Sequence, residues 1–221
     1  MIGIIVPAHN EEDFLDDCIK SLIAASHHQD LRGEPVEILI MLDDCSDHSH
    51  VVAKAHDVQM LTCQHRNVGM TRAAGARYML DRGARWLAFT DADSVVPYAW
   101  LADQIAFEVD AVCGIVEVGD WSEHGDQVRQ RYNALYRPVD DHRHIHGANL
   151  GVSAQAYLKA GGFRALAAHE DVHLVEDLQK TGASIVWTAR NSVITSARKN
   201  CRCKEGFGDY LNSLATSTLI S

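Results

Sequence analysis

The chain has 221 residues, of which 47% are hydrophobic. This length and composition leave little room for a second independent core and exclude disorder as the main state. With 20 Lys and Arg against 30 Asp and Glu, the formal net charge is −10. Nonspecific binding to nucleic acids or anionic membranes depends on basic surface, so this charge argues against both.

The cysteines and the N-terminus bear on where the protein works. The six cysteines are scattered, and only Cys201 and Cys203 lie close together, which is neither a disulfide framework nor a zinc-knuckle spacing. The apolar N-terminus reaches Pro7 and acidic residues without a basic lead-in, unlike a signal peptide. No stretch approaches the roughly 18 apolar residues of a membrane span. We therefore expect a cytoplasmic protein without a transmembrane segment, for which peripheral membrane contact stays open.

Apolar runs and helical spacing alternate through the first 96 residues. Continuous apolar runs predict buried strands over 3–7, 36–42, 58–62 and 86–90. The first run is followed by apolar residues at helical spacing, namely Phe14, Leu15, Cys18, Ile19 and Leu22. Two further helices are predicted over 50–56 and 69–82. Strands that alternate with helices are typical of a parallel sheet.

Beyond Asp93 the alternation continues and then weakens. Helices are expected near 98–108 and over 126–136, 154–159 and 172–180. Strands are expected over 111–118, 150–153, 184–188 and 192–196. The composition changes near residue 120, after which charged residues and His are frequent, but there is no repeat, linker or clear domain boundary. The sequence thus predicts one Rossmann-like α/β domain over residues 1–221, with a mainly parallel central sheet flanked by helices.

Polar side chains follow three of the predicted strands, at residues 7–11, 43–47 and 91–94. Ligands of parallel α/β sheets bind beyond the carboxyl ends of the strands, so these segments should converge on one crevice. Short acidic pairs are common on solvated turns, but Asp91 and Asp93 directly follow a buried run and should lie at the mouth of the sheet. There they can offer oxygens to Mg²⁺ or Mn²⁺ that also binds a diphosphate.

Several ordered motifs together resemble the family-2 glycosyltransferases, which have the GT-A fold. The similarity runs continuously over residues 2–96 and resumes in patches; it is carried by residues 5–12, 43–47, 67–69 with Arg72 and Gly75, 91–93, 146–149, 161–163 and 170–171. The resemblance implies a nucleotide-diphosphate-sugar donor, a divalent metal, and inversion at the anomeric carbon by single displacement. It also implies a donor half over 1–96 and an acceptor half with the C-terminal segment over 97–221.

The resemblance implies roles for individual donor-site residues. It places along the nucleotide Pro7, Ala8, Glu11, Asp43, Asp44, Arg72 and Asp91. In this interpretation Asp43 and Asp44 hydrogen-bond the base, while Asp91 lies near the ribose and forms a metal-binding pair with Asp93. From spacing alone, Arg72 fits a surface helix position equally well. His9 and Cys45 depart from the family pattern, and Cys45 leaves the shape of the acidic turn open.

The acidic pair Glu170-Asp171 precedes a predicted helix. Periodicity alone favours a capping role at the helix N-terminus. Inverting transfer needs a base for the acceptor hydroxyl. The resemblance implies that Asp171 is this base, with Glu170 positioning or assisting it.

Three further features are less specific, and the first two, residues 147–149 and 195–198, resemble family segments. Residues 147–149 would line the sugar and acceptor side through Asn149, or form a plain tight turn. Arg198 would meet the diphosphate, or be merely solvated. The His142-x-His144-x-His146 pattern is that of a zinc site, or of a loop that folds over the donor; its charged neighbours favour a solvated loop. His146 and His169 adjoin family motifs and are candidates for substrate contact.

Two other classes of protein stay open. A nucleotidyltransferase usually has a basic Gly-rich loop after the first strand, and residues 8–12 lack that charge. A noncatalytic sugar-nucleotide binder would keep every donor-site residue, although loss of Asp171 would then be expected. The sequence does not identify the sugar, the base or the acceptor, for which a small metabolite, a lipid phosphate, a peptide and a glycan all remain.

Overall fold

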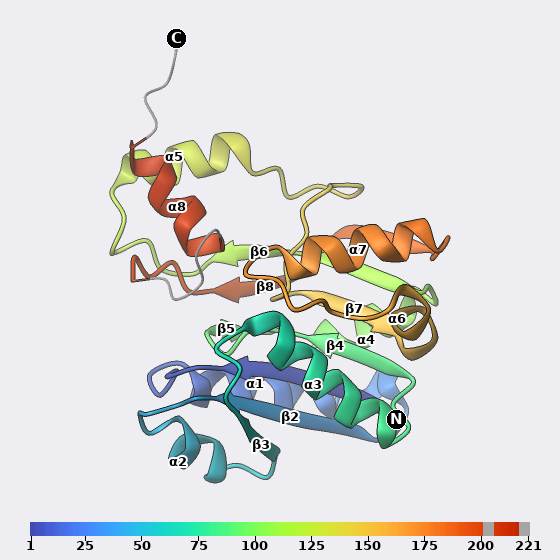
Figure 1. Cartoon of the computed structure of the whole chain (residues 1–221). Helices are drawn as coiled ribbons and strands as arrows, with labels where there is room; N and C mark the ends of the chain where they lie inside the picture. Colours follow the sequence, from blue (N-terminus) through green and yellow to red (C-terminus); the bar gives the residue numbers. More distant parts are fainter. Residues whose placement is uncertain (201–205, 217–221) are drawn as a thin grey trace.

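The computed structural model describes residues 1–200 and 206–216. Within these residues, eight strands form one sheet in the order β3-β2-β1-β4-β7-β6-β8-β5 (Figure 1). The strands are β1 (Ile2–Ala8), β2 (Val36–Asp43), β3 (Gln59–Cys63), β4 (Trp86–Phe89), β5 (Ser94–Val95), β6 (Ala111–Val118), β7 (Leu150–Ser153) and β8 (Ile185–Thr195).

The sheet is parallel on one side and mixed on the other. β1 pairs in parallel with both β2 and β4, and β3 pairs in parallel with β2. β7 then runs antiparallel between β4 and β6, β8 is parallel to β6, and β5 is antiparallel to β8. The prediction of an α/β fold with a mainly parallel central sheet is confirmed.

Helices cover both faces of the sheet because strand residues alternate between two cores. On β1, Ile4 and Val6 face one core and Ile5 the other. The first core packs against α1 (Leu15–Ser26), α2 (Ser49–Lys54), α4 (Trp100–Ala106), α5 (Asp126–Leu135) and α8 (Phe207–Thr216). The second packs against α3 (Val68–Asp81), α6 (Ala154–Ala160) and α7 (Glu170–Lys180). A short 3₁₀ helix, η1 (Gln29–Leu31), follows α1.

Helix α3 is fixed against the sheet by its cap and by glycine. The Asn67 side chain accepts a hydrogen bond from the Met70 amide at 2.9 Å, which stabilises the first turn. A Cβ on Gly75 would lie 2.5 Å from Cγ2 of Ile5 on β1, so only glycine allows this close approach. The helix therefore lies tightly over β1, and its first turns reach the carboxyl ends of the strands.

Two predictions for the C-terminal part are wrong. The strands expected over 184–188 and 192–196 are one strand, β8, because β8 pairs with β6 on both sides of a register shift between Cys113 and Ile115. Strand β5 and helix α8 were not predicted. β5 has only two residues and exists because β8 pairs with it, whereas α8 carries an apolar face (Leu211, Leu214) that helical spacing could have identified.

The helices also bear on membrane insertion. Over the part of the chain that the structure describes, no helix combines the length and the apolar character needed to cross a bilayer.

Candidate active site

A cavity of about 1180 Å³ opens at the carboxyl ends of β1, β2 and β4. The three polar segments expected to converge there do so, since residues 7–10, 43–44 with 46, and 91 with 93 all line it. The remaining wall comes from residues 66–68, 71–72, 145–148, 167–172, 195–196, 198, 200, 206–208 and 210, with Val116. The cavity thus lies between the parallel part of the sheet and the elements that follow β6.

Arg72 forms a buried ion-pair cluster in the cavity floor. Its guanidinium, on α3, donates hydrogen bonds to Asp91 after β4 and to Glu170 at the start of α7. We call these three residues the Arg72 cluster. Its Nε is buried without a hydrogen-bond partner among the described residues, and a Cβ on Gly147 would lie 2.5 Å from the guanidinium. Arg72 is therefore an interior residue and not a surface helix position.

The opposite charges of Arg72 and its carboxylate partners stabilise one another. Burial alone would lower the pKa of Arg72, but Asp91, Glu170 and Asp171 outweigh it and raise that pKa. Burial raises the pKa of Glu170, Arg72 opposes this, and Asp171 adds to it. The cluster joins β4 to α7, so it fixes the start of α7 relative to the sheet.

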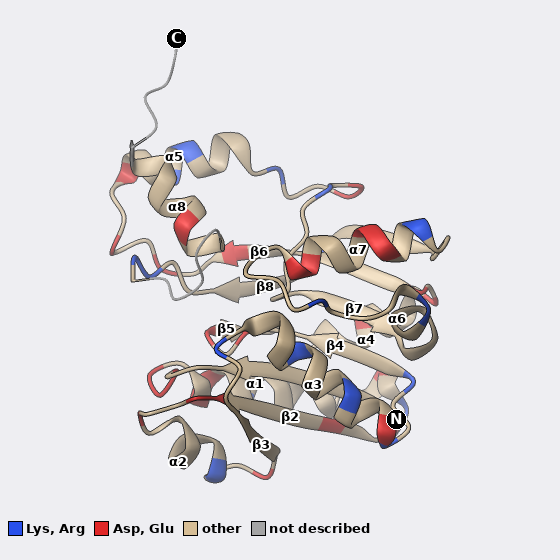
Figure 2. Cartoon of the chain, in the orientation of Figure 1, with Lys and Arg blue, Asp and Glu red and all other residues tan. Residues whose placement is uncertain are grey.

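The first turn of α7 is acidic (Figure 2). Asp171 belongs to this turn and lines the cavity. Its Oδ2 accepts a hydrogen bond from the Gly147 amide at 2.7 Å, and its Oδ1 accepts one from the Val172 amide at 2.8 Å. His169 precedes the helix in the left-handed region, at φ 59°, and lines the same wall. No side-chain hydrogen bond caps the start of α7, so Asp171 is an acidic residue of the first turn that also lines the cavity.

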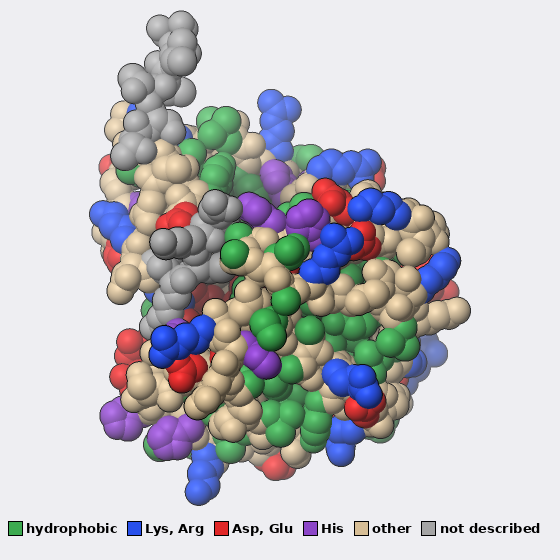
Figure 3. All heavy atoms as spheres, viewed as in Figure 1, with side chains coloured by type: hydrophobic (Ala, Val, Ile, Leu, Met, Phe, Trp, Pro, Cys, Tyr) green, Lys and Arg blue, Asp and Glu red, His purple; other side chains and the backbone are tan. Residues whose placement is uncertain are grey.

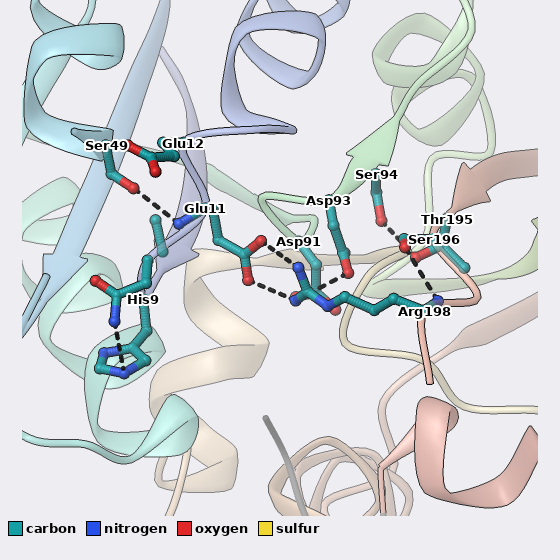
Figure 4. A network of polar contacts seen from close by, with 12 residues as sticks. His9, Glu11, Glu12, Ser49, Asp91, Asp93, Ser94, Thr195, Ser196 and Arg198 are labelled. Carbon is teal, nitrogen blue, oxygen red and sulfur yellow. Dashed lines mark hydrogen bonds and ion pairs between the residues drawn. The ribbon is translucent and has the colours of Figure 1, made fainter. Parts of the chain in front are cut away.

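Arg198, which also lines the cavity, forms a second cluster (Figure 4). Its Nη1 and Nη2 each donate to Glu11, both at 2.6 Å, and Nη2 lies 3.3 Å from Oδ2 of Asp93. We call Arg198, Glu11 and Asp93 the Arg198 cluster. The pairing of Ser94 in β5 with Thr195 in β8 brings the end of β8 to this position. Arg198 is therefore paired with carboxylates and not merely solvated.

Asp93 has an unusual environment for a carboxylate. Burial, and after it the neighbouring Asp91, raise the pKa of Asp93 to about 7, while Arg198 opposes the increase. The cavity has more carboxylates than cations around these clusters: Glu11, Asp91, Asp93, Glu170 and Asp171 face Arg72 and Arg198. A divalent cation would offset the excess, so the residues fit a metal bound through Asp91 and Asp93.

Asp91 and Asp93 form a pair and not a closed metal site. Among residues 1–200 and 206–216, no group of three or more His, Cys, Asp or Glu side chains is arranged to hold a metal ion. Any metal here would need further ligands from a bound molecule or from water. Cys201 and Cys203, whose spacing argued against zinc, lie outside the described residues.

Asp43 and Asp44 end β2 with different surroundings. Oδ1 of Asp43 accepts from the amides of His65 and Arg66, and its Oδ2 accepts from Asn67 and Thr71, at 2.6–3.2 Å. Burial would raise the pKa of Asp43, but these donors lower it overall. Asp44 has a left-handed backbone at φ 50° and pairs on the rim with the exposed Arg66. Asp43 thus holds the loop before α3, and Asp44 is the more accessible of the two acids.

Pro7 and Ala8 line the cavity, whereas Asn149 does not. The Asn149 amide is 1% exposed. Its Oδ1 accepts from the Trp100 indole at 2.9 Å, and its Nδ2 donates to the carbonyls of Ile115 and Asn191 at 2.8 and 2.9 Å. The neighbours Gly147 and Ala148 do reach the wall. The structure therefore brings this segment to the site but turns Asn149 into the core.

The histidines of the 142–146 loop form part of an aromatic stack. On the face drawn in Figure 3, histidine side chains lie in the upper half and also toward the lower left. His144 stacks on Tyr136 with ring centres 4.1 Å apart, and His142 stacks on His144 at 5.4 Å. His146 lines the cavity, and its Nε2 lies 3.0 Å from the Tyr136 hydroxyl. Burial, and after it His144 and His142, lower the pKa of His146 to about 3. The rings are held by packing, so this loop is not simply solvated.

Sequence reasoning missed part of the cavity wall. Gly206, Phe207, Gly208 and Tyr210 contribute from the start of α8, together with Thr71 from α3. Thr71 lies one residue before Arg72 and is completely buried. The apolar spacing of α8 was a usable signal for the helix, but no sequence pattern shows that its first turn reaches the cavity.

A mixed sheet of this order, with a carboxylate-rich cavity at its carboxyl ends, is the architecture of the GT-A class. The profile of glycosyl transferase family 2 matches residues 3–165. The chain belongs to this family. No curated protein sequence matches the chain.

Solved structures share the fold at low sequence identity. S. aureus TarS 1–349 in complex with UDP-GlcNAc aligns with a TM-score of 0.68 and 13% identity, over 97% of this chain and 65% of that one. The mannosyltransferase PcManGT from Pyrobaculum calidifontis, in complex with GDP-Man and Mn²⁺, aligns with a TM-score of 0.67 and 17% identity, over 90% and 57%. M. tuberculosis glucosyl-3-phosphoglycerate synthase aligns with a TM-score of 0.56 and 14% identity, over 98% and 77%. The chain spans 57–65% of the TarS 1–349 and mannosyltransferase chains.

Proposed function

We propose that this protein transfers a sugar from a nucleotide-diphosphate donor to an acceptor hydroxyl, with inversion at the anomeric carbon. The observation that carries the proposal is a single cavity lined both by the Asp91–Asp93 pair and by Asp171. Membership of glycosyl transferase family 2 supports the transfer chemistry. The UDP-GlcNAc and GDP-Man complexes of two structural neighbours support the class of donor.

The donor nucleotide is proposed to lie over the ends of β1 and β2. Pro7 and Ala8 line this part of the cavity, and Asp44 at its rim offers a carboxylate to an N–H group of the base. Asp43 acts indirectly, because its four hydrogen bonds fix the loop that leads into α3. Arg72 acts in the same indirect way, since it holds Asp91 toward the ribose side.

A divalent ion, Mn²⁺ or Mg²⁺, is proposed to be bound through Asp91 and Asp93. When bound, such an ion would neutralise part of the diphosphate charge and so favour departure of the nucleotide. The excess of carboxylates around the two arginines, and the raised pKa of Asp93, are the features of this chain that favour a cation there. The Mn²⁺ in the mannosyltransferase complex is consistent with this choice.

Asp171 is proposed to take the proton from the acceptor hydroxyl as that hydroxyl attacks. The Gly147 amide orients its carboxylate, and the buried Glu170 is held by Arg72, so Glu170 positions the start of α7. A carboxylate oxygen can accept more than one hydrogen bond, so Asp171 can hold these contacts and still receive a hydroxyl. The acceptor would enter from the side formed by residues 145–146, 206–208 and 210.

Thermal-shift measurement with Mn²⁺ and each of UDP, GDP, CDP and dTDP tests the donor site. A ligand that binds only the folded protein raises its apparent stability. We expect one or two of the nucleotides to stabilise the protein in a metal-dependent way, and Asp93→Ala to abolish this effect without unfolding the protein. Equal affinity in the variant, or in the presence of chelator, would show that the metal assignment is wrong.

A further inference from the structure

The Arg198 cluster joins three chain segments that are far apart in the sequence. Glu11 follows β1, Asp93 follows β4, and Arg198 follows β8. Figure 4 shows the guanidinium between the two carboxylates, with its dashed contacts to Glu11 and Asp93. Their side chains are 9–17% exposed, so water screens these charges only weakly. Arg198 thus occupies the space beside the carboxylate proposed for the metal.

The backbone around Arg198 is held by the loop that precedes α5. His124 Nε2 donates to the Ala197 carbonyl at 2.6 Å, and the Lys199 amide donates to Glu123 at 2.9 Å. The Arg198 amide donates to Ser196 Oγ at 3.2 Å. Because the flanking backbone is anchored on both sides, the Arg198 side chain is the part that can change partners by rotation about its own bonds.

We propose that Arg198 is a resident cation that competes with a divalent metal ion for Asp93, and that the diphosphate of the donor relieves this competition. The inference rests on the proposed function, since it needs the metal and the donor to bind in this cavity. It goes further by making metal binding without nucleotide weak and metal binding with nucleotide strong.

Charge explains the competition. Nη2 of Arg198 lies 3.3 Å from Oδ2 of Asp93, so a metal ion bound to this carboxylate must displace the guanidinium or lie beside it. Two cations held close together in a poorly hydrated site repel each other strongly. The metal ion alone therefore binds against the resident arginine.

The donor removes this conflict because its diphosphate is anionic. A guanidinium has five N–H donors, and it binds phosphate oxygens with the same forked geometry with which it binds a carboxylate. Arg198 can thus keep one bond to Glu11 while it turns toward the phosphate, which releases Asp93 to the metal. Metal and nucleotide then strengthen each other's binding, and this coupling must be reciprocal.

Mn²⁺ titration of the whole protein tests the inference without any turnover. Free Mn²⁺ is measured by electron paramagnetic resonance, with and without the nucleoside diphosphate that gives the largest thermal shift. For the wild type we expect weak binding of Mn²⁺ alone and at least about tenfold tighter binding with nucleotide. In Arg198→Gln, Mn²⁺ alone should bind at least about tenfold more tightly than in the wild type, and the coupling should fall below about threefold.

Two further variants keep the test interpretable. Arg198→Met removes the charge but retains apolar packing on Phe14, whose ring centre lies 5.3 Å from the guanidinium carbon, and it should behave like Arg198→Gln. Arg66→Gln removes the same charge from the cavity rim, where Arg66 is 78% exposed and pairs with Asp44. Because exposed charges are screened, it should change the affinity for Mn²⁺ alone by less than about twofold.

The outcomes separate the inference from the proposed function. If both Arg198 variants bind Mn²⁺ alone no more tightly than the wild type, the inference is overturned, although metal-dependent nucleotide binding would stand. If the Arg66 variant gains as much affinity as the Arg198 variants, the effect is one of general charge and the inference is again overturned. If the wild type binds Mn²⁺ with none of the four nucleotides, both the inference and the metal-dependent function fail.

Discussion

Both arginine clusters pair one guanidinium with two carboxylates, but their surroundings differ. Arg72 is 4% exposed on a helix, with a glycine backbone against its guanidinium and a carboxylate from each of two elements. Arg198 is 17% exposed after the last strand, and its partners come from the segments that follow β1 and β4. The first cluster is thus built into the packing, whereas the second lies where a ligand can compete for it. Because Asp91 of the first cluster is itself 35% exposed, the difference indicates that burial of the arginine, more than residue type, separates a structural ion pair from an exchangeable one.

The Arg72 cluster also carries the proposed catalytic end of α7. Glu170 is 4% exposed and bound to Arg72, while the next residue, Asp171, lies at the cavity wall. Adjacent acids therefore have separate tasks, since one anchors the helix and the other is accessible. The following predictions test this contrast in order of expected effect.

Asp171→Asn should cause the largest effect. Loss of a general base typically costs about 10²–10⁴-fold, so kcat should fall by at least about two orders of magnitude. Asn can still accept the Gly147 hydrogen bond, so nucleotide affinity and thermal stability should change little. Turnover is measured as release of the nucleoside diphosphate from the donor that binds, with calorimetry for its affinity. Glu176→Gln, on the same helix beside His173, is the matched control and should keep its turnover. Near-normal kcat in Asp171→Asn would move the base to Glu170 or a histidine.

Arg72→Met should cause the largest loss of stability. Removal of one partner from a buried ion pair leaves an uncompensated charge and costs about 3–5 kcal/mol of unfolding free energy. Arg198→Gln should cost less, about 1–2 kcal/mol, because the Arg198 side chain is 17% exposed against 4% for Arg72, and its partner Asp93 lines the cavity. Urea denaturation of both variants measures the difference. Equal losses would mean that the two clusters do not differ in the way described here.

Acid should lower the free energy of unfolding through His146, which lies next to Gly147 and so near the Arg72 cluster. Its pKa is lowered from 6.5 to about 3 in the folded protein. As pH falls below 6.5 the unfolded chain takes up a proton that the folded protein does not, so the stability present above pH 6.5 is progressively lost toward pH 3. One such proton contributes a slope of about 1.4 kcal/mol per pH unit. Denaturation of His146→Phe between pH 4 and 6 should show a slope smaller by about this amount. Identical slopes would contradict the assignment.

The rim pair Arg66–Asp44 should give the smallest effect. Asp44→Asn should reduce discrimination among UDP, GDP, CDP and dTDP by about tenfold or less, since one hydrogen bond to the base is worth about 0.5–1.5 kcal/mol. Calorimetric titration of the four nucleotides measures it. Asp43→Asn should instead weaken all four together, because Asp43 holds the loop before α3. Full discrimination in both variants would remove these acids from base selection.

Three strands of the parallel half were predictable because they are buried; the fourth, predicted as a buried strand over 58–62, is the edge strand β3, which is mostly exposed because only β2 pairs with it. The apolar runs predicted near 3–7, 36–42 and 86–90 correspond to β1, β2 and β4 with boundaries shifted by one residue or less at each end. The rule that ligands bind beyond the carboxyl ends of parallel strands also placed the segments of Asp43 and Asp91 at one cavity. In the second half the signal weakened because β5 is two residues long and β8 spans a register shift. Neither feature produces a periodic apolar pattern in the local sequence.

The sequence by itself determined the strands of the parallel half, the acidic segments at their ends and the family. These follow from local composition and spacing, which act within a few residues. Only the tertiary structure decided that Asn149 is saturated inside the core and that Arg72 is buried between two acids. It alone joined Arg198 to Glu11, 187 positions away. Such contacts depend on how distant segments pack, and a side chain's charge partner is set by that packing and not by its neighbours in the chain.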